Sequence, residues 1–282
     1  MAMHPTALQY IGLMALGFGV SCYGTLIGAG GGFVLMPVLL LLYPHENAHE
    51  LTAISLAVVL INTLSGTAAY ARMKRIEYKS GLLFAAATLP GAIAGVLTTA
   101  AVSRKFFEGL FSLFLTALAL FMLVRPKSDS AGKRRGDAFR SSSGMTRSAV
   151  AVDGIVFEYE YNRLLGMALF LFLGFVASFL GIGGGSLMVP LLAYVLNFPV
   201  AIATATSQLI VAILTFTSTL VHILLGSFHH GAHRIAAIGI GMLLGAQLGA
   251  YLSSKIKGKW IIRSLAIALA LVGIRMLLAL FW

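Results

Sequence analysis

Charged residues are scarce in this sequence. Asp, Glu, Lys and Arg make up only 10% of its 282 residues, whereas 59% are hydrophobic and the mean hydropathy is +0.94. Ordinary soluble domains carry about 25% charged residues, and a soluble fold needs a polar exterior that this composition does not supply. The scarcity of charge excludes a water-soluble enzyme and a disordered chain, and it indicates an exterior that faces lipid.

Acidic residues are the scarcest charged class, with nine Asp and Glu against 20 Lys and Arg. All of them lie between the apolar segments or at segment ends. Cation carriers and proton pumps keep a carboxylate at mid-depth, and acid–base hydrolases and many metal enzymes need one at their site. We therefore expect none of these classes. In a membrane protein, a basic surplus reports the orientation of the loops rather than a nucleic-acid partner.

Cysteine and buried ionisable groups are also rare. Cys22 is the single cysteine, so the chain has no internal disulfide framework. His229, His230 and His233 lie close together without a carboxylate or thiol beside them, and we expect no metal site there. His222 is expected at depth, where a structural or interfacial role is favoured over transfer of a coupling proton.

Apolar segments dominate what is present. Most are long enough for a helix that crosses a bilayer, but 33–43 and 186–196 have about eleven residues each, or roughly 16 Å of helix. The segments are 8–27, 33–43, 51–70, 81–101, 106–124, 164–180, 186–196, 201–225, 235–253 and 261–281. The sequence therefore predicts an all-α, polytopic membrane protein with two short, broken helices.

The two short segments belong to an internal duplication. Each follows a glycine cluster and contains a proline, and the stretch 28–37 recurs at 181–190, which is 153 positions later. The stretch Thr52–Ser55 likewise recurs at Thr204–Ser207, 152 positions later. Each half therefore holds five apolar segments. Because five is odd, the halves are expected to be inverted relative to each other, as in many secondary transporters.

Charge supports this topology. When the connection between the halves is placed inside the cell, 16 of the 20 basic residues fall on that side, and both termini lie outside. We expect a multi-pass protein of the inner cell membrane with a first repeat (1–125), a basic cytoplasmic linker (126–163) and a second repeat (164–282). Within the linker, Asp153-Gly154 is typical of a hairpin turn.

The glycine clusters are the first candidate site. Unwound backbone survives in lipid only inside protein or beside a water-filled cavity, and a helix that begins there presents free N–H groups to an anion. The cluster residues are Gly28, Gly30, Gly31, Gly32, Gly181, Gly183, Gly184, Gly185 and Ser186. The alternative is that small residues merely let helices pack closely, which is the interpretation adopted for Gly91, Gly95, Gly245 and Gly249.

Polar residues after each short segment are the second candidate site. Many of these hydroxyls are expected to bond to their own helix backbone. Those favoured as donors to an anion are matched between the halves or carry an amide group. They are Thr52, Ser55, Asn62, Thr204, Ser207 and Gln208.

The two Gly-x-Gly-Gly-Gly-x-x-x-x-Pro stretches, each followed by Thr-Ala-x-Ser, resemble those of the sulfite exporter TauE/SafE family of membrane permeases. The resemblance covers nearly the whole chain. It implies secondary transport of sulfur-containing anions such as sulfite, sulfoacetate or other organosulfonates, without a prosthetic group. It also implies that the cluster glycines, with Pro37 and Pro190, surround the transport pathway.

These observations favour an exporter of small anions that works by alternating access, not an enzyme. Its expected partners are the anion and the lipid bilayer, and the oligomeric state stays open. A passive anion channel is an alternative, because it can share the same amide cradle. A membrane-embedded enzyme is a weaker one, since His222 is the only base expected at depth.

Overall fold

A computed structural model describes residues 7–124, 145–152, 155–228, 232–256 and 258–281. Within these ranges the chain is almost entirely helical. The helices are α1 (Ala7–Leu26), α2 (Gly32–Leu42), α3 (Ala48–Arg72), α4 (Tyr78–Ala100), α5 (Arg104–Val124), α6 (Arg163–Phe179), α7 (Gly185–Pro190), which continues into a π-helical turn η1 (Leu191–Val195), α8 (Val200–Leu224), α9 (Ala232–Ser253) and α10 (Gly258–Phe281).

The short helices begin where glycine permits a left-handed backbone. Gly31 has a φ of 80° immediately before α2, and Gly184 has a φ of 82° immediately before α7. Side chains disfavour this region, whereas glycine adopts it freely. The helical path is therefore interrupted inside the protein, where residues 27–33 and 179–190 are all buried.

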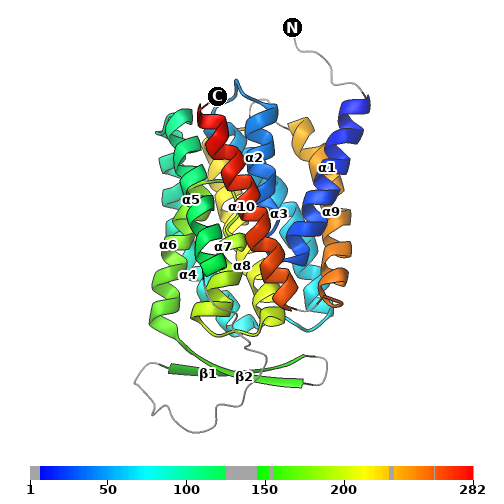
Figure 1. Ribbon diagram of the computed structural model, residues 1–282, viewed down its shortest axis with the longest axis vertical. Coiled ribbons are helices and arrows are strands. Elements are labelled where there is room, and N and C mark those ends of the chain that lie inside the picture. The colour runs from blue at the N-terminus through cyan, green and yellow to red at the C-terminus, as the bar shows by residue number, and fades with distance from the viewer. Residues whose placement is uncertain (1–6, 125–144, 153–154, 229–231, 257, 282) are drawn as a thin grey trace.

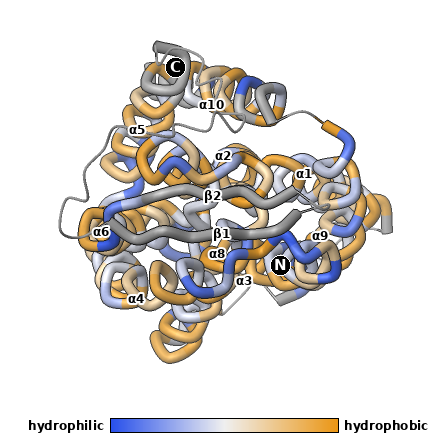
Figure 2. The backbone as a smooth tube through the Cα atoms, turned by 90° about the horizontal axis from the view of Figure 1, so that it is seen from below, coloured by the Kyte–Doolittle hydropathy of each residue, from blue (hydrophilic) through white to orange (hydrophobic). Residues whose placement is uncertain are grey.

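The helices form a bundle around a central pair. Figures 1 and 2 show α3 and α8 in the middle, α1 with α9 on one side, α4 with α6 on the other, and α5 with α10 along one edge, in agreement with the contacts between these elements. In the repeat, α1 corresponds to α6 and α4 corresponds to α9. The packing has the same symmetry, because α1 packs on α9 and α6 packs on α4. In Figure 1, α1 and α6 begin at opposite ends of the bundle.

The paired glycines outside the clusters serve helix packing, as the sequence predicts. A Cβ added to Gly95 on α4 would overlap the carbonyl oxygen of Phe175 on α6. A Cβ added to Gly249 on α9 would overlap the carbonyl oxygen of Cys22 on α1 in the same manner. Backbones approach this closely only where the side chain is missing.

The exterior of the bundle is apolar, as a bilayer requires. Large hydrophobic side chains that are at least half exposed occur on most helices, among them Leu82, Leu113, Phe172 and Phe216. Among the described residues, four helices are long and apolar enough to cross a membrane by length and composition, namely α3, α4, α8 and α9 from His233. The protein is an all-α, multi-pass membrane protein.

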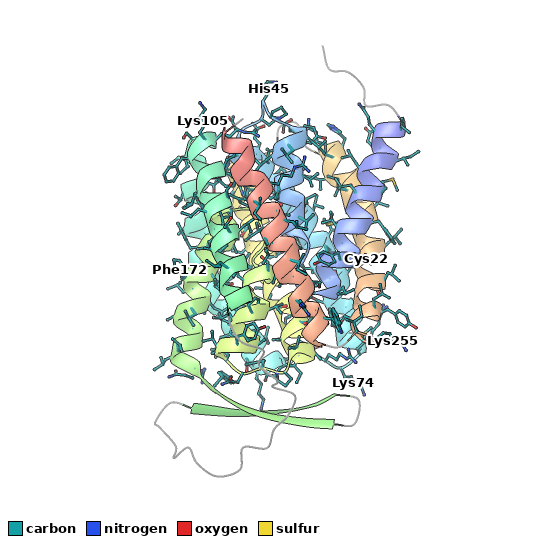
Figure 3. All side chains as sticks on the ribbon, in the orientation of Figure 1. Cys22, His45, Lys74, Lys105, Phe172 and Lys255 are labelled. Carbon is teal, nitrogen blue, oxygen red and sulfur yellow. The ribbon has the colours of Figure 1, made fainter. Side chains whose placement is uncertain are left out.

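One end of the bundle carries a β-hairpin, and we call it the hairpin end. Strands β1 (Met145–Val152) and β2 (Ile155–Asn162) are antiparallel, with Val152 opposite Ile155. The Asp153-Gly154 turn and most of the basic linker lie outside the described residues. Figure 3 places Lys74 and Lys255 at the hairpin end and His45 and Lys105 at the opposite end, the far end.

Tyr161 anchors the hairpin to the helices. Its side chain is buried, and its hydroxyl lies 2.6 Å from the hydroxyl of Ser80 on α4. Its ring packs against Phe84 and against Phe198, which follows η1. Phe198 therefore lies at the hairpin end, where α6 also begins, so the segment α7–η1 returns to the end from which α6 came.

Candidate functional site

The two glycine clusters meet inside the bundle. We call residues 28–32 the first glycine loop and residues 181–185 the second glycine loop. A Cβ added to Gly32 would overlap the carbonyl oxygen of Ile182, and one added to Gly185 would lie 2.5 Å from the Cα of Ala29. The two loops therefore touch backbone to backbone, and these contacts require glycine on both sides.

Each glycine loop is held by the Thr-Ala-x-Ser stretch of the other half. The Ser55 hydroxyl on α3 donates to the carbonyl oxygen of Gly181 over 2.6 Å, and the Ser207 hydroxyl on α8 donates to that of Gly28 over 2.8 Å. The threonines that precede these serines also pack against the loops. Thr52 contacts Gly181, and Thr204 contacts Gly28 while its hydroxyl bonds back to the carbonyl oxygen of Val200.

Asn62 on α3 braces the first loop. Its Nδ2 donates to the carbonyl oxygen of Gly30 over 2.8 Å, and its Oδ1 accepts hydrogen bonds from the hydroxyls of Ser21 and Thr25 on α1. The amide that the sequence suggests as an anion donor is thus engaged with protein groups. Ser21 and Thr25 escaped notice in the sequence because hydroxyls within an apolar helix are usually satisfied by their own backbone.

The helix starts that follow the loops present unpaired backbone donors. Among the described residues, no acceptor is found for the amides of Gly31, Gly32 and Phe33, or for those of Gly184, Gly185 and Ser186. The segment Gly185–Val195 runs on from the second loop as a continuous apolar helix. The first amides of a helix carry the positive end of its dipole, so both starts favour negative charge.

Three of the predicted site residues carry side-chain groups that are buried without a partner. They are Thr52 through Oγ1, Ser186 through Oγ and Gln208 through both amide atoms, and all three residues are 0% exposed. The Gln208 amide faces Gly66 on α3, since a Cβ added there would lie 3.2 Å from Oε1. Buried polar groups are normally paired, so these three side chains are candidates to bind a polar ligand.

Two valines occupy the centre of the arrangement. A Cβ added to Gly30 would lie 3.3 Å from Cγ1 of Val59 and 3.5 Å from Cγ1 of Val211, and one added to Gly183 would lie 2.7 and 3.4 Å from the same atoms. The valines therefore lie between both loops, one on each central helix. The two valines are 152 positions apart, which is the spacing at which Thr52–Ser55 recurs as Thr204–Ser207. This shared spacing could have identified them from the sequence.

Charged groups stay away from the glycine loops in the described part of the chain. Glu50 lies in the first turn of α3, and Glu77 caps α4 by accepting a hydrogen bond of 2.6 Å from the Ser80 amide. Glu46 pairs with Arg234 at the far end. The loops and the side chains around them thus form an uncharged environment in which the unpaired backbone amides are hydrogen-bond donors.

The histidine cluster of the sequence is only partly described by the structure. No group of three or more His, Cys, Asp or Glu that could hold an ion occurs among the described residues. His233 is exposed on α9 and packs edge-on against Tyr10, while His229 and His230 lie outside the described residues. His222 is buried at the end of α8, well separated along that helix from Gln208.

Comparison with known proteins identifies the family. A family model described as sulfite exporter TauE/SafE matches residues 13–276. The chain belongs to the sulfite exporter TauE/SafE family. The match spans both halves and includes both glycine loops, so the repeated motif of this TauE/SafE protein lies within the part of the chain that defines the family.

Relatives of this TauE/SafE protein carry transporter names. The "probable membrane transporter protein YunE" of Bacillus subtilis is 29% identical over 276 residues, which cover 96% of this chain and 98% of that protein. The "probable membrane transporter protein MJ0441" of Methanocaldococcus jannaschii is 25% identical over 279 residues, which cover 94% of each. No solved structure matches the chain significantly. Together with the apolar helices, these matches make the protein a membrane transporter.

Proposed function

We propose that this TauE/SafE protein exports a small sulfur-containing anion, such as sulfite, sulfoacetate or another organosulfonate, across the inner cell membrane. The observation that carries the proposal is the set of unpaired amides at the two helix starts, together with the unpartnered groups of Thr52, Ser186 and Gln208. Sulfite and sulfonate groups present several negatively charged oxygens, and such oxygens are bound by convergent N–H and O–H donors.

The polarity of the loops favours an anion over a cation. A cation would be coordinated by backbone carbonyl oxygens, but those of Gly28, Gly30 and Gly181 already accept hydrogen bonds from Ser207, Asn62 and Ser55. The unpaired backbone amides at the two helix starts are hydrogen-bond donors, which an anion requires. A lone anion can also leave a negative cell interior downhill, because the membrane potential contributes about 2.3 kcal/mol per charge per 100 mV.

Alternating access follows from the proposed architecture of two inverted repeats. The two loops touch in this conformation, and Val59 and Val211 fill the space beside them, which suits a state closed at the centre. If the two halves exchange conformations, the side that opens changes from one end of the bundle to the other. A passive channel would instead need a continuous open path through the same point.

Counterflow in proteoliposomes tests the proposal. Purified protein is reconstituted with unlabelled sulfite inside, and uptake of labelled sulfite, sulfoacetate, taurine and sulfate is compared. We expect saturable exchange of sulfite or sulfoacetate that falls at least tenfold in Ser186→Ala and Gln208→Leu, because about 1.4 kcal/mol of lost binding corresponds to a factor of ten. Thr98→Ala is the matched control, since that exposed hydroxyl bonds only to Ala94 in its own helix.

Two results would count against the proposal. Exchange at the wild-type rate in both site variants would remove the glycine loops from the binding site. An absence of exchange of every sulfur-containing anion by the wild-type protein would contradict the function itself.

A further inference from the structure

A second group of unpartnered polar atoms lies at the far end, away from the glycine loops. His222 in the last turn of α8 is 0% exposed, and His49 lies in the first turn of α3. The centroids of the two imidazole rings are 4.7 Å apart, and the ring planes are tilted by 47°. These two histidines are 173 residues apart in the sequence, and only the antiparallel packing of α3 on α8 brings them together.

Ser227 links the two rings. Its buried hydroxyl lies 2.8 Å from Nε2 of His49 and 3.2 Å from Nδ1 of His222, and its backbone amide donates to the carbonyl oxygen of His222. A hydroxyl has one proton, so it donates to one ring nitrogen and accepts from the other. The remaining nitrogens, Nδ1 of His49 and Nε2 of His222, are buried without a hydrogen-bond partner in the described part of the chain.

Few charged groups surround this cluster in the described part of the chain. Glu50 is the next residue on α3. From α9, Arg234 is neutralised by Glu46, and His233 is exposed; Phe228 presents an uncharged ring to His222. Two imidazolium ions this close would repel each other strongly. The cluster therefore accommodates one positive charge at most.

An open, largely apolar groove lies beside the cluster between α3, α8 and α9. Gly226 and Phe228, the two neighbours of Ser227, line it together with Thr219, whose buried Oγ1 has no partner. The cluster is also mechanically connected to the transport site, because α3 and α8 carry Ser55, Ser207 and the two central valines.

We infer that His49, Ser227 and His222 form a proton-binding site that couples protonation at the far end to anion binding. A proton from the solvent adds to an unpartnered imidazole nitrogen, and the same proton returns to solvent when the cluster is neutral again. The single added charge strengthens anion binding from the far-end side, and its loss weakens binding there and so favours release of an exported anion. Helices α3 and α8 connect the cluster to the transport site. The inference rests on the proposed function.

The test measures the KM of labelled sulfoacetate exchange in proteoliposomes at pH values from about 5.5 to 8, the range in which histidine ordinarily titrates. A sulfonate does not change charge in this range, whereas sulfite does, so sulfoacetate isolates the protein's protonation. For entry at the far end, we expect the KM to be at least about fivefold lower at pH 5.5 than at pH 8, the lower bound of ordinary coupling between two sites.

Variants separate a proton site from a structural role. His49→Gln and His222→Gln should exchange sulfoacetate with a KM that no longer depends on pH, and Ser227→Ala should retain both imidazoles but shift the pH of the transition. His45→Gln is the matched control, because His45 is an exposed histidine at the same end. Nitrogen-15 NMR spectra of the wild-type protein with labelled histidine report imidazole protonation directly. This measurement does not depend on whether the variants fold.

The outcomes distinguish this inference from the proposed function. A pH-independent KM in the wild type, an unchanged pH profile in the two glutamine variants, or spectra without a titrating buried imidazole would overturn the proton site and leave anion transport standing. A wild-type protein that exchanges no sulfur-containing anion would contradict the proposed function, and the imidazole titration would still report on the cluster.

Discussion

Ser207 donates a hydrogen bond of 2.8 Å to the carbonyl oxygen of Gly28, a residue 179 positions earlier in the chain. Ser55 makes the corresponding bond of 2.6 Å to Gly181, 126 positions later. Each half of the protein thus holds the glycine loop of the other half. The two loops are therefore mechanically linked, since a shift of α3 moves the second loop and a shift of α8 moves the first.

Removing either serine hydroxyl should loosen a glycine loop. In Ser55→Ala and Ser207→Ala a buried carbonyl oxygen loses its donor, which costs about 1–3 kcal/mol. We expect a lower midpoint of thermal unfolding in detergent and slower anion exchange for each variant. Thr98→Ala, which removes an exposed hydroxyl, should leave both measurements unchanged. Equal stability of all three variants would show that these hydrogen bonds do not hold the loops.

A single methyl group at the loop contact should abolish transport. Gly32→Ala and Gly185→Ala place a Cβ against the backbone of Ile182 and Ala29, respectively, and neither glycine has a positive φ, so the effect is steric. Gly12→Ala is the control, because nothing lies within 4 Å of the added Cβ, and alanine favours a helix. Exchange in proteoliposomes, with membrane insertion checked by expression level, measures the effect. Wild-type exchange in either loop variant would contradict the proposed role of the contact.

Shortening the central valines should make the protein leak. Val59→Ala and Val211→Ala, separately and together, remove the methyl groups that lie beside both Gly30 and Gly183. We expect the double variant to release anion from loaded vesicles without a counter-anion, faster than the wild type. Leu97→Ala, which trims an exposed side chain on α4, is the control. A double variant as tight as the wild type would place the barrier elsewhere.

The two ends of the bundle should face opposite sides of the membrane. In a Cys22→Ala background, a cysteine introduced at the exposed Asn47 is expected to react with a membrane-impermeant thiol reagent in intact cells. A cysteine at the exposed Lys255, at the hairpin end, should react only after the cells are opened. The opposite labelling pattern would reverse the orientation that the basic residues predict.

Much of the fold follows from local properties of the sequence. The predicted segments 33–43 and 186–196 differ by only a residue or so at each boundary from α2 and from the segment Gly185–Val195. They could be predicted because a run of glycines breaks a helix wherever it stands, and because the run occurs twice with the same spacing. The packing role of Gly95 and Gly249 was predictable for the same reason, since a missing side chain acts locally.

The polar side chains of the site were less predictable. In the sequence, Asn62 and Gln208 are equivalent, since each carries an amide that can donate to an anion. In the structure, Asn62 is hydrogen-bonded to Gly30, Ser21 and Thr25. The side-chain amide of Gln208 has no hydrogen-bond partner in the described part of the chain. The difference depends on which helix faces each amide. His49 attracted no attention in the sequence because its significance comes from a histidine on a different helix.

The sequence by itself determined that the chain lies in lipid, where its helices are interrupted and that the interruption is repeated. These outcomes depend on composition and on backbone freedom, which each residue carries with it. Only the tertiary structure decided that the glycine loops touch each other, that each is held by the opposite half, and which buried donors stay free. Those outcomes depend on distances between residues more than a hundred positions apart, because a hydrogen bond or a steric contact acts over a few ångströms and only packing brings such residues within reach.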